Sequence, residues 1–233
     1  MTSLAADGAD VRGMFDRVAA RYDTANRIMS AGIDVRWRRK AIGRLLEGLG
    51  ETPRILDLGA GTLDGAVSIA RRLPGARIAA ADFARQMLKA GRKKIPAGAA
   101  LDTHAADGHH LPYRDAAFDG AFSAFCVRNL ADLPRALGEL RRVVRPGGRV
   151  VILEFCRPEK TRFFFDKIWN ARVLPLVGWA VTGDRAAYRY LPETIQRFAS
   201  LAELEGLLRA AGFGSVEGRP LFPSGVASQV VAA

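Results

Sequence analysis

A glycine-bearing turn directly after an apolar strand pattern is the part of this sequence most suited to chemistry. The segment RILDLGAGT, residues 54–62, has the pattern of a strand that ends near Gly59 and Gly61 and passes into a helix. Glycine has no Cβ, so the backbone can turn tightly and approach a bound ligand there. Asp82 ends a second apolar run, RIAAAD, about twenty residues later, where a carboxylate can accept hydrogen bonds from both hydroxyls of a ribose. Turn and carboxylate together predict a site for a cofactor that carries adenosine.

Leu63 and Asp57 favour S-adenosylmethionine over NAD as that cofactor. A dinucleotide needs a third glycine and a helix N-terminus to seat its pyrophosphate, and Leu63 occupies the place of that glycine. Asp57, on the strand before the turn, suits the cationic sulfonium and ammonium of S-adenosylmethionine better than a pyrophosphate. A structural role, in which Asp57 bonds the N–H groups of the turn, stays open beside this one.

A third segment supplies Asp107 and Gly108 in a loop that follows the third strand pattern. The residues from 104 to 119, HAADGHHLPYRDAAFD, resemble class I methyltransferases, in which an acidic residue at this place bonds the adenine amino group. An ordinary turn aspartate is the alternative. His109 and His110 have no partner at metal-ligand spacing, so we expect solvated loop histidines and no metal site.

Composition predicts one domain in the cytoplasm. A chain of 233 residues with 49% hydrophobic content can bury a single core. No run of about 18 uncharged apolar residues occurs, the first ten residues lack a signal-peptide pattern, and the two cysteines lack zinc or disulfide-framework spacing. The net charge of +11 favours anionic partners such as nucleic acid or an acidic lipid surface, or it reflects the composition of the source genome.

The order of patterns predicts a Rossmann-like α/β fold over residues 1–233. A helical cap occupies about residues 1–50. Short apolar runs then alternate with helical stretches, which is typical of a parallel sheet; the fifth strand should begin near Arg149, after the PGG turn. An aromatic, arginine-rich helical insertion follows at about residues 158–198, placed to cover a substrate pocket. The last two strand patterns, GFGSVEGRPL and GVASQVVA, should pair as a hairpin.

Several segments in order resemble one family of class I methyltransferases. They are VRGMFDRVAARYDTANRIMSAGIDVRWRR near the start, then DFARQML, FCVRNLADLPRAL, VVRPGGRVVILEFCRP and DRAAYRYLPETI. Together they resemble the menaquinone and ubiquinone biosynthesis C-methyltransferases, from about Val11 to Val226. The resemblance implies an enzyme that transfers a methyl group from S-adenosylmethionine to a ring carbon of demethylmenaquinol or of a polyprenyl methoxy-benzoquinol.

The same resemblance implies the cofactor contacts and two departures from the family pattern. The contacts fall on Thr62, on Asp82, and on Asp107 with Gly108. The family usually carries glycine where Leu63 stands and serine where Ala124 stands, although Ser123 is adjacent. We expect these two departures to affect the affinity for S-adenosylmethionine more than the fold.

Three residues are candidates for work on the acceptor. Arg128 follows the fourth strand pattern, at the carboxyl edge of the sheet, where it can stabilise a phenolate or organise a water that removes the proton. Pairing with a cap carboxylate such as Asp23 is its structural alternative. Asn129 can hold Arg128 or bond the substrate oxygen, and a purely local role at the end of the strand is its alternative. Tyr22 resembles a family position over the pocket, and a core aromatic is the equal alternative. Tyr188 and Tyr190 are weaker candidates.

The implied substrate and the positive net charge together predict the binding partners of the protein. We expect a prenylated quinol, no nucleic acid, and peripheral contact with anionic membranes; a homo-oligomer is left open. One basic patch comprises Arg36, Arg38, Arg39 and Lys40 beside Trp37, and another comprises Lys160, Arg162 and Lys167 beside Phe163 to Phe165. Two other functions stay open: a methyltransferase acting on oxygen or nitrogen of another small molecule, and a non-catalytic scaffold relative.

Overall fold

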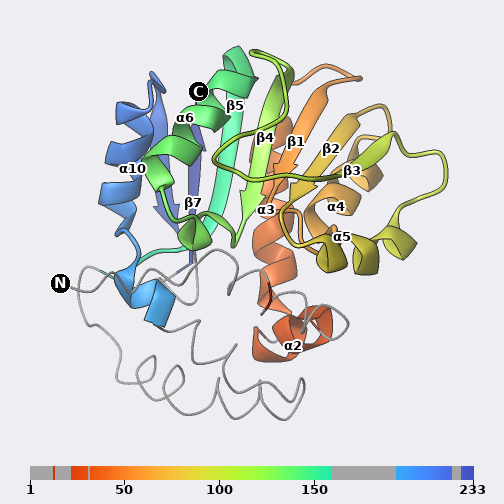
Figure 1. Cartoon of the computed structure of the whole chain (residues 1–233), viewed down its shortest axis with the longest axis horizontal. Helices are drawn as coiled ribbons and strands as arrows, with labels where there is room; N and C mark the ends of the chain where they lie inside the picture. The colour runs from red at the N-terminus through yellow and green to blue at the C-terminus, as the bar shows by residue number, and fades with distance from the viewer. Residues whose placement is uncertain (1–12, 14–21, 31, 159–192, 222–226) are drawn as a thin grey trace.

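A single mixed sheet organises the molecule (Figure 1). The computed structural model describes residues 13, 22–30, 32–158, 193–221 and 227–233. Seven strands lie in the order β3-β2-β1-β4-β5-β7-β6, with β7 antiparallel to both of its neighbours. The strands are β1 (Arg54–Leu58), β2 (Arg77–Asp82), β3 (Leu101–Ala105), β4 (Phe118–Ala124), β5 (Val144–Phe155), β6 (Val216–Pro220) and β7 (Ala227–Ala232).

Helices cover both faces of the sheet. The described helices are α2 (Tyr22–Met29), α3 (Ile33–Leu46), α4 (Asp64–Arg72), α5 (Arg85–Gly91), α6 (Leu133–Val143) and α10 (Leu201–Ala210), with short 3-10 turns η1 (Arg92–Lys94) and η2 (Val127–Asn129). Side chains alternate across β1, so Ile55 packs with α3 and α4 on one face, while Leu56 and Leu58 pack with α6 and α10 on the other. The near-continuous apolar strands follow from burial on both faces.

The sheet order creates a topological switch point between β1 and β4. From β1 the chain runs outward through β2 and β3, then returns to pair β4 with the other edge of β1. Open α/β sheets bind ligands in the crevice at the carboxyl ends of the strands at such a point. The glycine turn after β1 and the segment after β4 both lie at that edge.

The α/β fold predicted from the sequence is confirmed, with one difference at the fifth strand. The strand begins at Val144, which pairs with Phe118, and the register then shifts so that Arg149 pairs with Gly120. The PGG segment is therefore a bulge within β5, where Gly147 adopts a left-handed φ of 73°. The predicted terminal hairpin is present as β6 and β7. Most of the predicted insertion lies outside the described residues.

Candidate functional site

The glycine turn is held against the end of β2. Gly59 and Gly61 adopt left-handed φ angles of 71° and 51°, which glycine reaches without the Cβ clash of other residues. The Gly59 and Ala60 amides donate to the Ala81 carbonyl at 2.8 and 3.1 Å. Neighbouring strands thus fix the shape of the turn before any ligand arrives.

Asp82 braces the same turn with its side chain. Its Oδ2 accepts from the Gly61 amide at 2.8 Å, and its Oδ1 accepts from the Ala84 amide at 2.8 Å. A carboxylate oxygen has two lone pairs, so one that accepts from the turn can also accept from a ribose hydroxyl. The sequence pattern indicated the ligand role of Asp82 but not this bracing role, because it cannot show where a side chain folds back.

Asp57 is a buried carboxylate beneath the first turn of α4. Its side chain lies so close to Gly65 that a Cβ there would come within 2.7 Å of Oδ2. Among the described residues, Oδ2 has no hydrogen-bond partner. Burial raises the pKa of Asp57 from 3.8 to about 7; the Ala66 amide and Arg38 oppose that shift, while Asp82 and Asp64 add to it. The Gly61 amide of the glycine turn bonds Asp82, whereas Asp57 bonds the backbone amide of Ala66 just after the turn, so a structural role for Asp57 at the entry of α4 stays open.

Thr62 and Leu63 complete the entry into α4. The Thr62 hydroxyl donates to Oδ1 of Asp23 in α2. Leu63 adopts a left-handed φ of 69° although it carries a full side chain, which costs about 1–2 kcal/mol. The same side chain is completely buried in the core between the sheet and α3 and α4. Burial of this side chain offsets the backbone strain, which explains how leucine is accommodated where glycine is expected.

Asp107 and Gly108 lie in the loop after β3. The Ala106 amide donates to the Asp82 carbonyl at 3.0 Å, so this loop begins beside the end of β2. Asp107 Oδ1 accepts from the amide and ring Nδ1 of His109 at 2.9 and 2.6 Å. Partial burial raises the pKa of Asp107, but the His109 bonds and the nearby His110 outweigh it and lower the pKa overall. The Asp107 side chain remains 60% exposed and able to meet a donor.

His109 is not the solvated histidine that the sequence suggested. Its side chain is only 18% exposed, and its Nε2 accepts from the Asp132 amide at 3.1 Å. Asp132 in turn caps α6 by accepting from the Arg135 amide. His109 therefore connects the loop after β3 to the start of α6. Within the described ranges, no group of three or more histidine, cysteine and acidic side chains is placed to hold a metal ion.

Arg128 lies in η2, just after β4, in a buried ion pair with Glu154 of β5. Its Nη1 donates to Glu154 Oε1 at 2.7 Å and to the Phe125 carbonyl at 2.8 Å, and its amide donates to Glu154 Oε2 at 3.2 Å. The side chains are 6% and 1% exposed. The predicted alternative partner, Asp23, is wrong, because Asp23 bonds Thr62 and Lys94 instead. Glu154 was missed by the sequence analysis, although a carboxylate in the apolar run RVVILEF was a usable signal.

Of the remaining predicted residues, the structure describes some and leaves the side chains of others undescribed. Asn129 ends η2, where its backbone amide donates to the backbone carbonyl of Cys126 at 2.8 Å. Tyr22 begins α2, and its side chain lies outside the described part of the structure, as do Tyr188 and Tyr190. Ser123 donates to the Leu58 carbonyl at 2.9 Å and is buried, so it ties β4 to β1 and does not replace the serine expected at Ala124.

The segment after β4 and the glycine turn are packed together. Gly59 contacts Cys126 so closely that any Cβ at position 59 would overlap the Cys126 side chain. The described candidates therefore gather at one edge, at the carboxyl ends of β1, β2, β3 and β4.

The chain also matches a known family in sequence. The sequence model of the ubiE/COQ5 methyltransferase family matches residues 2–232. The chain belongs to this family.

Curated relatives in the ubiE/COQ5 family cover most of the chain. A demethylmenaquinone methyltransferase of Thermus thermophilus is 46% identical over 203 residues, 86% of this chain and 91% of the relative. A ubiquinone/menaquinone biosynthesis C-methyltransferase UbiE of Paracoccus denitrificans is 38% identical over 216 residues, 91% of this chain and 85% of the relative. The resemblance read from the sequence segments is confirmed, and so is the prediction that the chain is a methyltransferase.

Solved structures support the fold of this ubiE/COQ5 family member. A methyltransferase of Thermotoga maritima, described as a possible histamine N-methyltransferase, matches with a TM-score of 0.63 and 20% identity over 95% of this chain and 98% of the other. A putative methyltransferase of Haloferax volcanii, solved with its Trm112 activator, matches with a TM-score of 0.67 and 18% identity over 94% and 96%. At these identities the likeness shows the fold alone.

Proposed function

We propose that this ubiE/COQ5 family member transfers the methyl group of S-adenosylmethionine to a ring carbon of a prenylated quinol, either demethylmenaquinol or a polyprenyl methoxy-benzoquinol. The observation that carries the proposal is the joint presence, at one sheet edge, of an Asp82-braced glycine turn and a buried Arg128–Glu154 pair. The first feature suits an adenosine cofactor and the second suits an acidic ring hydroxyl. The activities for which the curated relatives are named support the choice of acceptor.

The charges at the site fit S-adenosylmethionine. Asp57 lies close enough to Asp82 that Asp82 raises its pKa, so two carboxylates repel each other beneath the glycine turn, while Asp64 is paired with Lys94 and Arg38. A cationic ligand relieves this repulsion, whereas a pyrophosphate increases it. When bound, the cofactor supplies a methyl group on a positively charged sulfur. In this proposal Asp82 would hold the ribose, Asp107 with Gly108 would hold the adenine, and Thr62 with Asp57 would lie near the amino-acid end.

Arg128 acts on the acceptor in this proposal. Glu154 and the Phe125 carbonyl fix the direction of the guanidinium, so the side chain is ordered before the quinol binds. A fixed cation stabilises a phenolate oxygen, or orients the water that takes its proton, without the reorganisation that a solvated arginine requires. Asn129, the next residue in η2, and Tyr22, at the start of α2, are proposed to bond the ring oxygens.

Removing the Asp82 carboxylate is expected to weaken S-adenosylmethionine binding. Asp82→Ala should lower affinity by about 1 to 3 kcal/mol, because charge-assisted bonds to the ribose and to the Gly61 amide are both lost. Isothermal titration calorimetry measures the change. Asp102→Ala removes an exposed carboxylate of the neighbouring strand β3 and serves as the matched control. An Asp82→Ala affinity equal to that of the Asp102 control would remove Asp82 from the site.

The acceptor is tested by competition between substrates. Purified enzyme is given S-adenosylmethionine with a prenylated naphthoquinol, a prenylated benzoquinol or a small unprenylated phenol, and methylated products are followed by mass spectrometry. We expect efficient turnover of at least one prenylated quinol and little of the phenol. The reverse preference would favour the second candidate function, methylation of another small molecule on oxygen or nitrogen.

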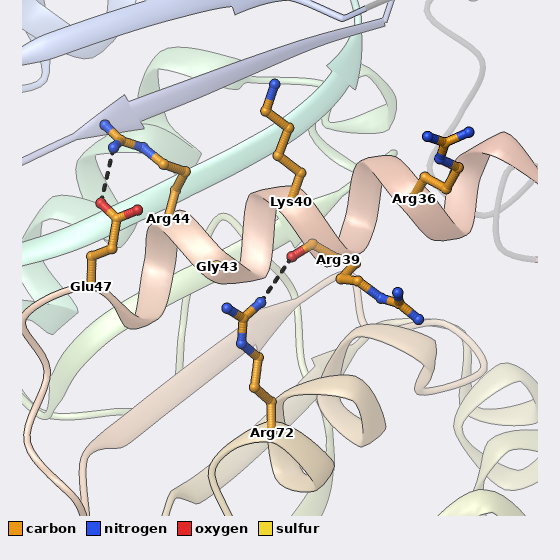
Figure 2. A pocket seen from close by; sticks show the side chains of 7 residues that line it. All are labelled: Arg36, Arg39, Lys40, Gly43, Arg44, Glu47 and Arg72. Atoms are coloured by element: carbon orange, nitrogen blue, oxygen red, sulfur yellow. Dashed lines mark hydrogen bonds and ion pairs between the residues drawn. The ribbon is translucent and has the colours of Figure 1, made fainter.

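We also propose that the enzyme works in the cytoplasm and contacts anionic membranes through the exposed face of α3. None of the helices in the described ranges is both long and apolar enough to cross a bilayer. Figure 2 shows Arg36, Lys40 and Arg44 along α3, with Arg72 reaching across from α4 to donate to the Arg39 carbonyl at 3.2 Å. These residues line a groove of about 550 Å³ together with Gly43 and Glu47.

This surface differs from the patch read off the sequence. Arg38 is mostly buried and pairs with Asp34 and Asp64, at 3.3 and 3.6 Å. Trp37 is buried and packs edge-on against Phe155 at 6.3 Å between ring centroids. Neither faces a lipid surface. The basic face consists of residues 36, 39, 40, 44 and 72 instead, while the second predicted patch, at Lys160, Arg162 and Lys167, lies outside the described residues.

The basic face should confer salt-sensitive binding to acidic liposomes. Each basic residue near an anionic surface contributes about 1 kcal/mol to membrane binding. When binding is measured by sedimentation with acidic liposomes, a variant with glutamine at 36, 39 and 40 should therefore lose most of its binding. Glutamine at Arg77, Lys89 and Arg114, three exposed basic residues elsewhere, is the charge-matched control. Equal binding to neutral and acidic liposomes at low salt would refute the membrane proposal.

A further inference from the structure

A carboxylate on α2 holds the entry of α4, and the proposed function gives it no role. Asp23, in the first turn of α2, accepts from the Thr62 hydroxyl through one oxygen. Its other oxygen accepts from Lys94 Nζ at 2.7 Å. Thr62 belongs to the glycine turn and Lys94 ends η1, so one side chain joins three segments that are distant in the sequence.

Lys94 is itself fixed from a second direction. Its Nζ donates to Asp64 Oδ1 at 2.6 Å, and Asp64 lies in the first turn of α4, directly after the glycine turn. Asp64 also pairs with Arg38 of α3 and Arg27 of α2, each at 3.6 Å. Burial raises the pKa of Asp64, but Lys94, Arg38 and Arg27 outweigh it and lower the pKa overall. Asp64 therefore holds Lys94 in place beside Asp23.

The direction of the Asp23–Thr62 bond has a chemical consequence. An ionised carboxylate only accepts hydrogen bonds, so Thr62 must donate its single hydroxyl hydrogen to Asp23. The Thr62 oxygen then has only lone pairs to offer to any other group. It can accept from an ammonium, and it cannot donate to a carboxylate.

The end of the cofactor that meets Thr62 follows from the sheet order. Asp82 and Asp107 follow β2 and β3, which lie to one side of β1. Ribose and adenine on that side leave the amino-acid end over the turn after β1, which contains Thr62. Resting on the proposed function, we propose that Asp23 is a positioning residue: held by Lys94, it orients the Thr62 hydroxyl as an acceptor for the ammonium group of S-adenosylmethionine.

The test compares two ligands that differ in the amino-acid end and in the charge on sulfur, and a Thr62→Val background separates these two differences. S-adenosylmethionine carries the ammonium, whereas 5′-methylthioadenosine has the same adenosine and a thioether but no amino acid. Calorimetry on the full chain should show that Asp23→Ala raises the Kd of S-adenosylmethionine about tenfold, the scale of one charge-assisted hydrogen bond, and leaves the Kd of 5′-methylthioadenosine within about twofold. In a Thr62→Val background, which lacks the hydroxyl, Asp23→Ala should add less than about a twofold change.

Control variants separate positioning from packing. Arg209→Gln removes an ion pair with Glu205 on α10 that has no part in the Asp23–Lys94–Asp64 network, and it should leave both Kd values unchanged. Thr62→Ser keeps the hydroxyl and should still bind S-adenosylmethionine more tightly than 5′-methylthioadenosine, whereas Thr62→Val should lose this preference. If Asp23→Ala does not fold, these two variants test the inference instead. Equal losses for both ligands, or an undiminished Asp23 effect in Thr62→Val, would overturn the inference while leaving the proposed function intact. Failure of the wild-type chain to bind S-adenosylmethionine would overturn both.

Discussion

Replacing Arg128 by methionine is expected to lower the free energy of unfolding by about 3 to 5 kcal/mol, because it leaves a buried carboxylate without its cationic partner. Glu154 is 1% exposed and bonds Arg128 at 2.7 Å. The proposal for the acceptor site adds a second effect: turnover by the folded protein should fall about a hundredfold or more, as when a preorganised donor to a developing oxyanion is removed. The affinity for S-adenosylmethionine should change little, since Arg128 is assigned to the acceptor.

A double variant separates these two effects. Arg128→Met with Glu154→Leu removes both charges, and apolar replacement of a whole buried ion pair is often neutral or stabilising. We expect chemical denaturation to show recovered stability and the methyl-transfer assay to show turnover that stays low. Recovery of both stability and turnover would make Arg128 a structural residue only.

Replacing Asp57 by asparagine is expected to stabilise the ligand-free protein above neutral pH. Burial raises the pKa of Asp57 from 3.8 to about 7, so the folded state binds a proton that the unfolded state has released. The resulting stability is fully present below pH 3.8 and is lost as pH rises through about 7. Each pH unit between the two pKa values lowers the free energy of unfolding by about 1.4 kcal/mol. At pH 8 the ionised Asp57 therefore destabilises the ligand-free protein by up to about 4 kcal/mol. The Asp57→Asn variant has no such penalty, because its amide does not titrate.

The same carboxylate makes cofactor binding depend on pH. A cationic ligand favours ionised Asp57, so affinity for S-adenosylmethionine should rise with pH between about 5 and 7 and release a proton on binding. Asp57→Asn should flatten this dependence and weaken binding at pH 8. Denaturation and calorimetry at pH 5 to 8.5 measure both effects. Identical pH profiles for wild type and variant would show that Asp57 does not titrate in this range.

The sequence was sufficient for the elements and for the edge at which the site lies. Strand and helix periodicity placed β1, β2 and β4 closely, because buried parallel strands are short apolar runs between helical stretches. Since the carboxyl ends of parallel strands meet at one edge, the positions of Asp82, Asp107 and Arg128 after their strands were enough to group them.

Long-range pairing of charges could not be read in the same way. Arg128 and Glu154 are 26 residues apart, and Asp23 and Lys94 are 71 apart. These pairs meet only because β4 lies beside β5 and because α2 folds over the glycine turn. Arg38 was misplaced for a related reason: the four basic residues within positions 36 to 40 of one helix point in several directions, and only the packing of α3 on α4 shows which side chain faces Asp64.

The fate of a labelled methyl group tests the central proposal most directly. The enzyme is incubated with S-adenosylmethionine labelled with carbon-13 at the methyl and with a prenylated quinol that lacks one ring methyl, and the product is analysed by nuclear magnetic resonance. The proposed function predicts the label as a methyl group bonded to a ring carbon. Label found as a methyl ether on a ring oxygen, or no labelled quinol from a chain that binds the cofactor, would contradict it.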